Sequence, residues 1–138
     1  MLTKPGKPGQ PPRIDRLAIG RATESAAENY LRQNGLVCVH RNFRCRLGEI
    51  DLVMRDGDCL VFVEVRFRRQ GQHGSGAESI TYAKRQKLVR SAAFYLSRCK
   101  ISSHQVCRFD VISIAQASPA DKPGYEFNWI RGAFQADG

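Results

Sequence analysis

Acidic side chains interrupt two short apolar runs in the segment GEIDLVMRDGDCLVFVEVRFRR, residues 48–69. Glu64 lies in the middle of LVFVEV, where the burial of an isolated charge is costly. Because side chains alternate faces along a strand, Glu49 and Asp51 share one face of the first run. In the second run Glu64 and Arg66 share a face by the same rule. These residues have the types and spacing that a phosphate or metal site would need.

The turn between the two runs decides how close the acids come. A two-residue hairpin turn can fall at residues 56–57 or at residues 57–58. The first choice places Glu49 opposite Glu64, and the second places Asp51 opposite Glu64. Either choice groups the three carboxylates on one face, within about 4.5 to 8 Å of one another. A three-residue loop with no compensating bulge would separate them.

Like charges this close on apolar strands raise each other's pKa unless a cation lies between them. Mg²⁺ typically takes one or two protein carboxylates together with water and phosphate oxygens. Asp51 and Glu64 therefore predict a site for Mg²⁺ or Mn²⁺ that accepts a phosphate, and Arg66 would add a fixed positive charge for that phosphate. Alternatively, Glu64 and Arg66 pair with neighbours on a solvated sheet face, and the local pattern fits both interpretations equally.

The first half of the chain supplies the elements that must position these acids. Residues 14–34 fit a helix that stops at Gly35, with Glu24 near the centre of its inward stripe. Val61, Val63 and Val65 point away from Glu64 and should pack beneath a helix. The expected strands, rich in β-branched and aromatic residues, lie at 36–46, 49–55 and 59–67.

The second half predicts a crossover to a further strand. Ser79 or Thr81 could cap a helix that runs to about Cys99, with its inward positions at Ile80, Leu88, Ala92 and Leu96. A strand is expected at 106–115, and Pro119 and Pro123 mark a loop before 125–134, which fits either an edge strand or a packing segment. The long helix makes the fourth strand parallel to the third. The expected class is α/β, in the order αβββαβ, with a mixed central sheet flanked by helices.

A single domain is expected, because 138 residues are enough for one core and too few for two. The domain should span residues 13–138, after a Pro/Gly-rich basic tail at 1–12 that we expect to be disordered. The polar segment 68–79 is typical of a loop.

The charge balance favours a polyanionic partner. The chain has 22 Lys and Arg against 13 Asp and Glu, a formal net charge of +9, which favours a polyanion such as nucleic acid without naming which one. The alternative is a soluble basic protein that binds no specific partner. The residues that could follow a nucleic-acid backbone are Arg68, Arg69, Lys84, Arg85 and Lys87. A solvated helix face is the ordinary alternative for the last three.

A cytoplasmic location without a membrane partner is expected. The N-terminal segment lacks the apolar core of a secretory signal, and no run approaches the roughly 18 apolar residues of a membrane span. The cysteines number 5 and form no CxxC pair, which favours reduced thiols over a disulfide framework.

Several motifs resemble the YraN family of bacterial proteins. They are TExxAxxYL at 23–31, RNFRCRxGEIDLV at 41–53, LVFVEVRFR at 60–68 and RFDV at 108–111. The resemblance implies the restriction-endonuclease-like fold of the PD-(D/E)xK nucleases, near the archaeal Holliday-junction resolvases.

Carried over residue by residue, the resemblance implies four catalytic residues. Asp51 matches the aspartate of the core motif, and Glu64 matches the acid of the ExK element. Glu24 matches the first-helix glutamate that completes the acidic cluster in the resolvases. Arg66 stands where the lysine usually is, and because arginine stays charged it could stabilise a pentacoordinate phosphate but not act as a general base.

The leading hypothesis is therefore a metal-dependent nuclease that acts on DNA, including branched or structured DNA. The alternative is a non-catalytic nucleic-acid-binding module that keeps the nuclease fold, and a third reading is a structural protein with a vestigial pocket. A homodimer is compatible with the resemblance. Trp129 and Phe134 would then serve either in internal packing or in the dimer contact.

Overall fold

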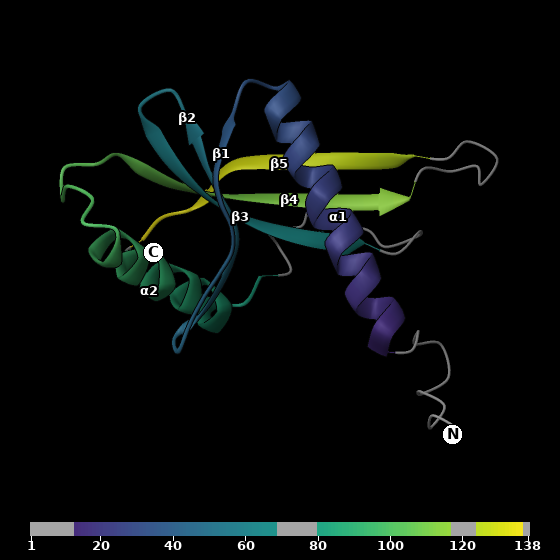
Figure 1. Ribbon diagram of the computed structural model, residues 1–138, viewed down its shortest axis with the longest axis horizontal. Coiled ribbons are helices and arrows are strands. Elements are labelled where there is room, and N and C mark those ends of the chain that lie inside the picture. Colours follow the sequence, from purple (N-terminus) through teal and green to yellow (C-terminus); the bar gives the residue numbers. More distant parts are fainter. Residues whose placement is uncertain (1–12, 69–79, 117–123, 137–138) are drawn as a thin grey trace.

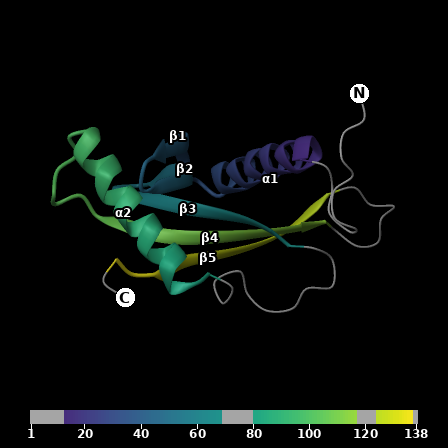
Figure 2. The same ribbon diagram turned by 90° about the horizontal axis from the view of Figure 1, so that it is seen from below.

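The computed structural model describes residues 13–68, 80–116 and 124–136, which form one sheet with a helix on each face (Figure 1, Figure 2). The mixed α/β class is confirmed, and 125–134 is an edge strand that extends the expected order. The predicted tail 1–12, most of the loop 68–79 and the loop with Pro119 and Pro123 lie outside the described residues. In chain order the elements are α1 (Arg13–Gln33), β1 (Val37–Cys45), β2 (Gly48–Asp56), β3 (Cys59–Arg68), α2 (Tyr82–Arg98), β4 (Cys107–Gln116) and β5 (Tyr125–Phe134).

The sheet has five strands in the order β1-β2-β3-β4-β5. β3 and β4 are parallel, as expected for strands joined through α2, and the other neighbouring pairs are antiparallel. Asp56 pairs with Cys59, so the turn between β2 and β3 falls at Gly57 and Asp58. Of the two registers that the sequence allows, the structure has the one that places Asp51 opposite Glu64.

Each face of the sheet packs against one helix. Val61 and Val63 are fully buried beneath α1, and Val65 packs against the same cluster, which confirms the predicted face of β3. The α1 cluster also contains Ala27, Leu31, Leu36, Leu52, Met54, Ile112 and Ile114. The α2 cluster contains Phe43, Ile50, Val53, Leu60, Phe62, Ala92, Tyr95 and Phe109.

α2 begins at a capped end that fixes its first turn. Thr81 is the N-cap: its backbone is extended, and its hydroxyl accepts a hydrogen bond from the Lys84 amide at 3.2 Å. Ile80, Leu88 and Ala92 are buried as predicted. The predicted inward position Leu96 is half-buried and packs against the α2 cluster, in which Tyr95 is the more buried neighbour.

The β1–β2 hairpin passes from one face of the sheet to the other. Arg41 and Leu52 pair on the side of α1, whereas Phe43 and Ile50 pair on the side of α2. Asn42, between the two pairs, has φ of 53°, a left-handed conformation that asparagine tolerates better than most residues. The hairpin therefore twists sharply at Asn42. Asp51 lies opposite Asn42 on β2, between the pairs Arg41–Leu52 and Phe43–Ile50.

The tip of this hairpin docks on α2. Gly48 has φ of 149°, and a Cβ atom there would lie 3.0 Å from the Ser91 hydroxyl. Glycine is required at this close approach of backbone to helix.

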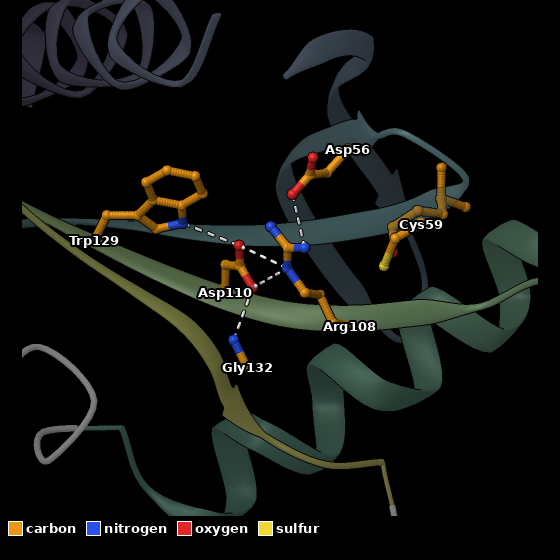
Figure 3. Close-up of polar contacts among 7 residues, drawn as sticks. Asp56, Cys59, Arg108, Asp110, Trp129 and Gly132 are labelled. Carbon is orange, nitrogen blue, oxygen red and sulfur yellow. Dashed lines mark hydrogen bonds and ion pairs between the residues drawn. The ribbon is translucent and has the colours of Figure 1, made fainter. Parts of the chain in front are cut away.

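A buried acid ties the last two strands together. Asp110 accepts hydrogen bonds from Trp129 Nε1 and the Gly132 amide, both at 2.9 Å, and from Arg108 Nε at 3.0 Å (Figure 3). Arg108 also contacts Asp56 at 2.9 Å. Trp129 packs with the α1 cluster and Phe134 stacks on Phe109, so both serve in internal packing.

Two predictions about disulfides and membranes can be compared with the structure. All five cysteines are free thiols in the structure. Among the helices that the structure describes, none contains an 18-residue stretch apolar enough to cross a membrane.

We expect Asp110→Ala to lower the free energy of unfolding by about 2–4 kcal/mol, because it removes the buried carboxylate that accepts hydrogen bonds from Arg108, Trp129 and the Gly132 amide. Urea unfolding followed by Trp129 fluorescence measures this loss. The matched control is Asp58→Ala, at an exposed turn position, which should change stability by less than about 0.5 kcal/mol. Equal effects of the two substitutions would contradict the structural role of Asp110.

Candidate functional site

Asp51 and Glu64 lie next to each other where the pairing of β2 and β3 ends. The register runs from Asp56 and Cys59 to Leu52 and Val63, and the two acids are the next residues in their strands. Both are buried, with Asp51 8% and Glu64 7% exposed. Asp51 Oδ2 accepts a hydrogen bond from the Val65 amide at 2.8 Å. This side-chain hydrogen bond joins β2 to β3 just beyond the last residue pair of the strand ladder.

The carboxylate of Glu64 is paired with a lysine from α2. Lys84 Nζ lies 2.6 Å from Glu64 Oε1, and the lysine side chain is 48% exposed. The sequence predicted Lys84 as a contact for the nucleic-acid backbone and did not anticipate this ion pair. A signal was present, because the first turn of α2 contains no acid and begins a strongly basic segment, which is unfavourable at the positive end of a helix.

Glu24 reaches the site from α1. Its side chain is half-buried and accepts a hydrogen bond from Asn42, the residue that faces Asp51 across the β1–β2 register. Burial raises the pKa of Glu24, and the hydrogen bond from Asn42 opposes that rise. Glu24 also lines a cavity of about 220 Å³ between α1 and the hairpin, together with Arg21, Ser25, Glu28, Arg41, Asn42 and Leu52.

Burial and the neighbouring acids dominate the electrostatics of Asp51. Burial and, next, the charge of Glu64 raise the pKa of Asp51 to about 8. The hydrogen bond from the Val65 amide opposes this rise, and the charges of Glu24 and Glu49 add to it. Asp51 is therefore protonated at neutral pH in the metal-free protein, whereas Glu64 is paired with Lys84.

Glu49 does not join the buried pair. Its side chain is 56% exposed and forms an ion pair with Arg44 at 3.3 Å. Within residues 13–68, 80–116 and 124–136, no group of three or more His, Cys, Asp or Glu side chains is arranged to hold a metal ion. A metal site would have to rest on Asp51 and Glu64, with water and substrate oxygens as further ligands.

The other predicted basic residues lie on β3 and at the start of α2. Arg66 and Arg68 alternate with the valines of β3 and so share the face of Glu64, and both are half-buried. Arg85 is half-buried, and its Nε atom is buried with no hydrogen-bond partner. Lys87 is exposed. Arg69, the remaining predicted contact for nucleic acid, lies outside the described residues.

Two buried acids that the sequence analysis did not single out belong to the other face. Glu28 is held by Arg41, whose Nε and Nη2 both donate to it and lower its pKa. Asp110 is held by the network of β4 and β5 (Figure 3). In Glu28 and in Asp110, both carboxylate oxygens accept hydrogen bonds from other residues of the protein, so we assign these two acids to the framework.

The free energy of unfolding of the metal-free protein should fall as pH rises from about 4 to about 8. In the unfolded chain Asp51 ionises near 3.8, but in the folded chain it ionises near 8, so the folded state binds more protons in this interval. The contribution of Asp51 is therefore fully present below pH 3.8 and lost above 8. Urea unfolding in a chelator at about pH 5 and pH 7.5 measures the difference.

The control for this experiment is Asp51→Asn, which keeps the shape and an acceptor for the Val65 amide but cannot ionise. This variant should have a flatter pH dependence than the wild type. If the two proteins lose stability equally over this interval, Asp51 is not the group that titrates.

Comparison with known proteins assigns the chain to a family. Residues 23–114 match the model of the uncharacterised protein family UPF0102. A UPF0102 protein of Legionella pneumophila is 45% identical over 117 residues, which cover 85% of this chain and 94% of the relative. One of Herminiimonas arsenicoxydans is 44% identical over 125 residues, covering 91% and 93%, and one of Pseudomonas syringae is 42% identical over 127 residues, covering 91% and 98%. The chain therefore belongs to the UPF0102 family, the YraN type that its sequence motifs indicate.

Proposed function

We propose that this protein is a cytoplasmic, metal-dependent nuclease that hydrolyses phosphodiester bonds of DNA. The observation that carries the proposal is the pair Asp51 and Glu64, two buried carboxylates side by side at the end of a strand pairing. Burial of two adjacent acids has no value for stability, because each loses hydration and repels the other. Such an arrangement is best explained by a cation that the acids receive.

The residues present fit Mg²⁺ or Mn²⁺. Both ions prefer hard oxygen ligands, and Asp51 and Glu64 supply oxygens in a site that water enters only in part. Burial and the charge of Glu64 raise the pKa of Asp51, and a cation bound between the two carboxylates would favour the ionised form of both. When bound, the ion would lower the pKa of a water molecule and neutralise charge on the scissile phosphate.

The other residues of the site have separate tasks in this proposal. Arg66, on the same strand and face as Glu64, would hold a phosphate oxygen with a charge that does not titrate. Glu24 would orient the site from α1, through Asn42. Since Arg66 cannot accept a proton at neutral pH, proton removal from the attacking water would depend on the metal and the carboxylates.

The fold is compatible with the same proposal. The order from α1 to β4, with Asp51 on β2, Glu64 on β3 and Glu24 on α1, agrees with the restriction-endonuclease-like core that the resemblance implies. We extend the proposal to that core, to the kinship with archaeal Holliday-junction resolvases and to branched DNA as one substrate. A homodimer would suit a branched substrate, which presents two strands to cut.

A specific observation also supports the alternative, a nucleic-acid-binding module without cleavage. Glu64 already has a cationic partner in Lys84, and Arg66 replaces the lysine that the nuclease motif usually has. A site neutralised by its own residues could retain the fold and bind DNA without metal. Activity of the purified protein separates these two functions.

Asp51→Asn and Glu64→Gln should each reduce cleavage by at least about 100-fold, because each removes ligand charge at nearly constant shape. The assay uses duplex, single-stranded and branched substrates with Mg²⁺ or Mn²⁺. Asp58→Asn, the same chemical change at an exposed turn position, should retain wild-type activity.

Two results would contradict the nuclease proposal. Equal cleavage by the wild type and Asp51→Asn would show that the activity comes from a contaminant. No cleavage by the wild type on any substrate, with DNA binding intact, would favour the binding module.

Binding to DNA should weaken steeply with salt and depend little on base sequence, because Arg68, Arg85 and Lys87 can contact only the backbone charge in this role. Combining Arg85→Met with Lys87→Met should lower the slope of log K against log salt by about 2. Fluorescence anisotropy with two duplexes of unrelated sequence measures the slope. Combining Arg98→Met with Lys100→Met, an equal loss of two positive charges at exposed positions at the far end of α2, is the control, and a slope equal to that of Arg85→Met with Lys87→Met would refute this surface.

A further inference from the structure

The first turn of α2 has an unusual charge for a helix N-terminus. Thr81 caps the helix, and no acid follows in the first turn, where Lys84 and Arg85 lie instead. Cations at this end oppose the helix dipole and destabilise the helix. For Lys84 the compensating partner is Glu64, at 2.6 Å.

We infer that Lys84 is an exchangeable counter-ion, which neutralises Glu64 in the metal-free protein and leaves it for a phosphate of the nucleic acid when a divalent cation binds. This inference rests on the metal site of the proposed function and adds a second task for the same carboxylate. It also changes the predicted role of Lys84. This lysine would bind the nucleic-acid backbone only after the metal has replaced it at Glu64.

The geometry allows this exchange. Glu64 is fixed in β3 and its side chain is 8% exposed, whereas the Lys84 side chain is 48% exposed. The lysine side chain has a flexible four-carbon stem, so its ammonium group can move into solvent. The N-terminus of α2 meanwhile stays capped by Thr81. The acid is therefore the fixed member of the pair and the lysine is the mobile one.

Lys84 and a divalent cation must also compete for the carboxylate of Glu64. An ammonium group in contact with a carboxylate oxygen repels any second cation that binds to the same carboxylate. A divalent ion at Asp51 and Glu64 must either displace Lys84 or bind against its repulsion. Removing the ammonium group should therefore strengthen metal binding, which is the opposite of what a purely structural lysine would do.

The first test measures Mn²⁺ binding by the full-length chain at constant pH without nucleic acid. We expect Lys84→Met to bind Mn²⁺ about three- to tenfold more tightly than the wild type, and Lys84→Arg to stay close to the wild type. Lys84→Ala repeats the test with a smaller side chain, in case the methionine variant does not fold. Lys100→Met controls for the loss of one positive charge far from the site and should not change the affinity.

The second test follows the ammonium groups directly by lysine side-chain NMR during a titration with Mg²⁺. The Lys84 signal should change with saturation of the site, and the Lys100 signal should not. An unchanged Lys84 signal under saturating Mg²⁺, or equal Mn²⁺ affinity of wild type and Lys84→Met, overturns the exchange and leaves the metal site intact.

Failure of the proposed function gives a different result. If the wild type binds no Mn²⁺, or if Asp51→Asn binds it as tightly as the wild type, the metal is not held by Asp51 and Glu64. The metal site and the exchange then fall together.

Discussion

The site depends on the burial of two carboxyl groups, Asp51 and Glu64, where the pairing of β2 and β3 ends. Asp51 and Glu64 are both nearly buried, and their proximity would be unfavourable if both were ionised and unpaired. Three groups compensate in the metal-free protein: a proton retained on Asp51, the amide of Val65 and the ammonium group of Lys84. Of these groups, Lys84 alone belongs to α2, so its contribution depends on the docking of α2 on the sheet.

The backbone of the β1–β2 hairpin places Asp51 at this point. At Asn42 the hairpin crosses from the side of α1 to the side of α2, so the residue opposite, Asp51, lies where the two helices both approach the sheet. Glu24 approaches from α1 through Asn42, and Lys84 approaches from α2. On the α1 face, Asp110 pairs with Val63, the neighbour of Glu64, and its hydrogen bonds to Trp129 and Gly132 join β4 to β5 (Figure 3).

Local pattern predicted most of the fold, because strand alternation and helix periodicity depend on nearby residues. It could not choose between the two hairpin registers, since Gly57 suits either turn, and only the packed structure fixes Gly57 at the first position with φ of 59°. It also missed the contact between Lys84 and Glu64. That contact depends on where the start of α2 docks, which no periodicity of either segment encodes.

The balance of charge gives Lys84 and Arg66 different parts in the proposed chemistry. With Asp51 protonated and Lys84 on Glu64, the group of three is neutral. With Asp51 ionised and a divalent cation on both carboxylates, the metal and acids are neutral by themselves, so the charge of Lys84 becomes surplus. A phosphate of the nucleic acid carries the single negative charge that balances it. Arg66 stays on β3 and keeps its charge in both states. Metal binding would therefore free the charge of Lys84 for a phosphate of the nucleic acid, and nucleic acid would bind more tightly to the metal-loaded protein than to the metal-free protein.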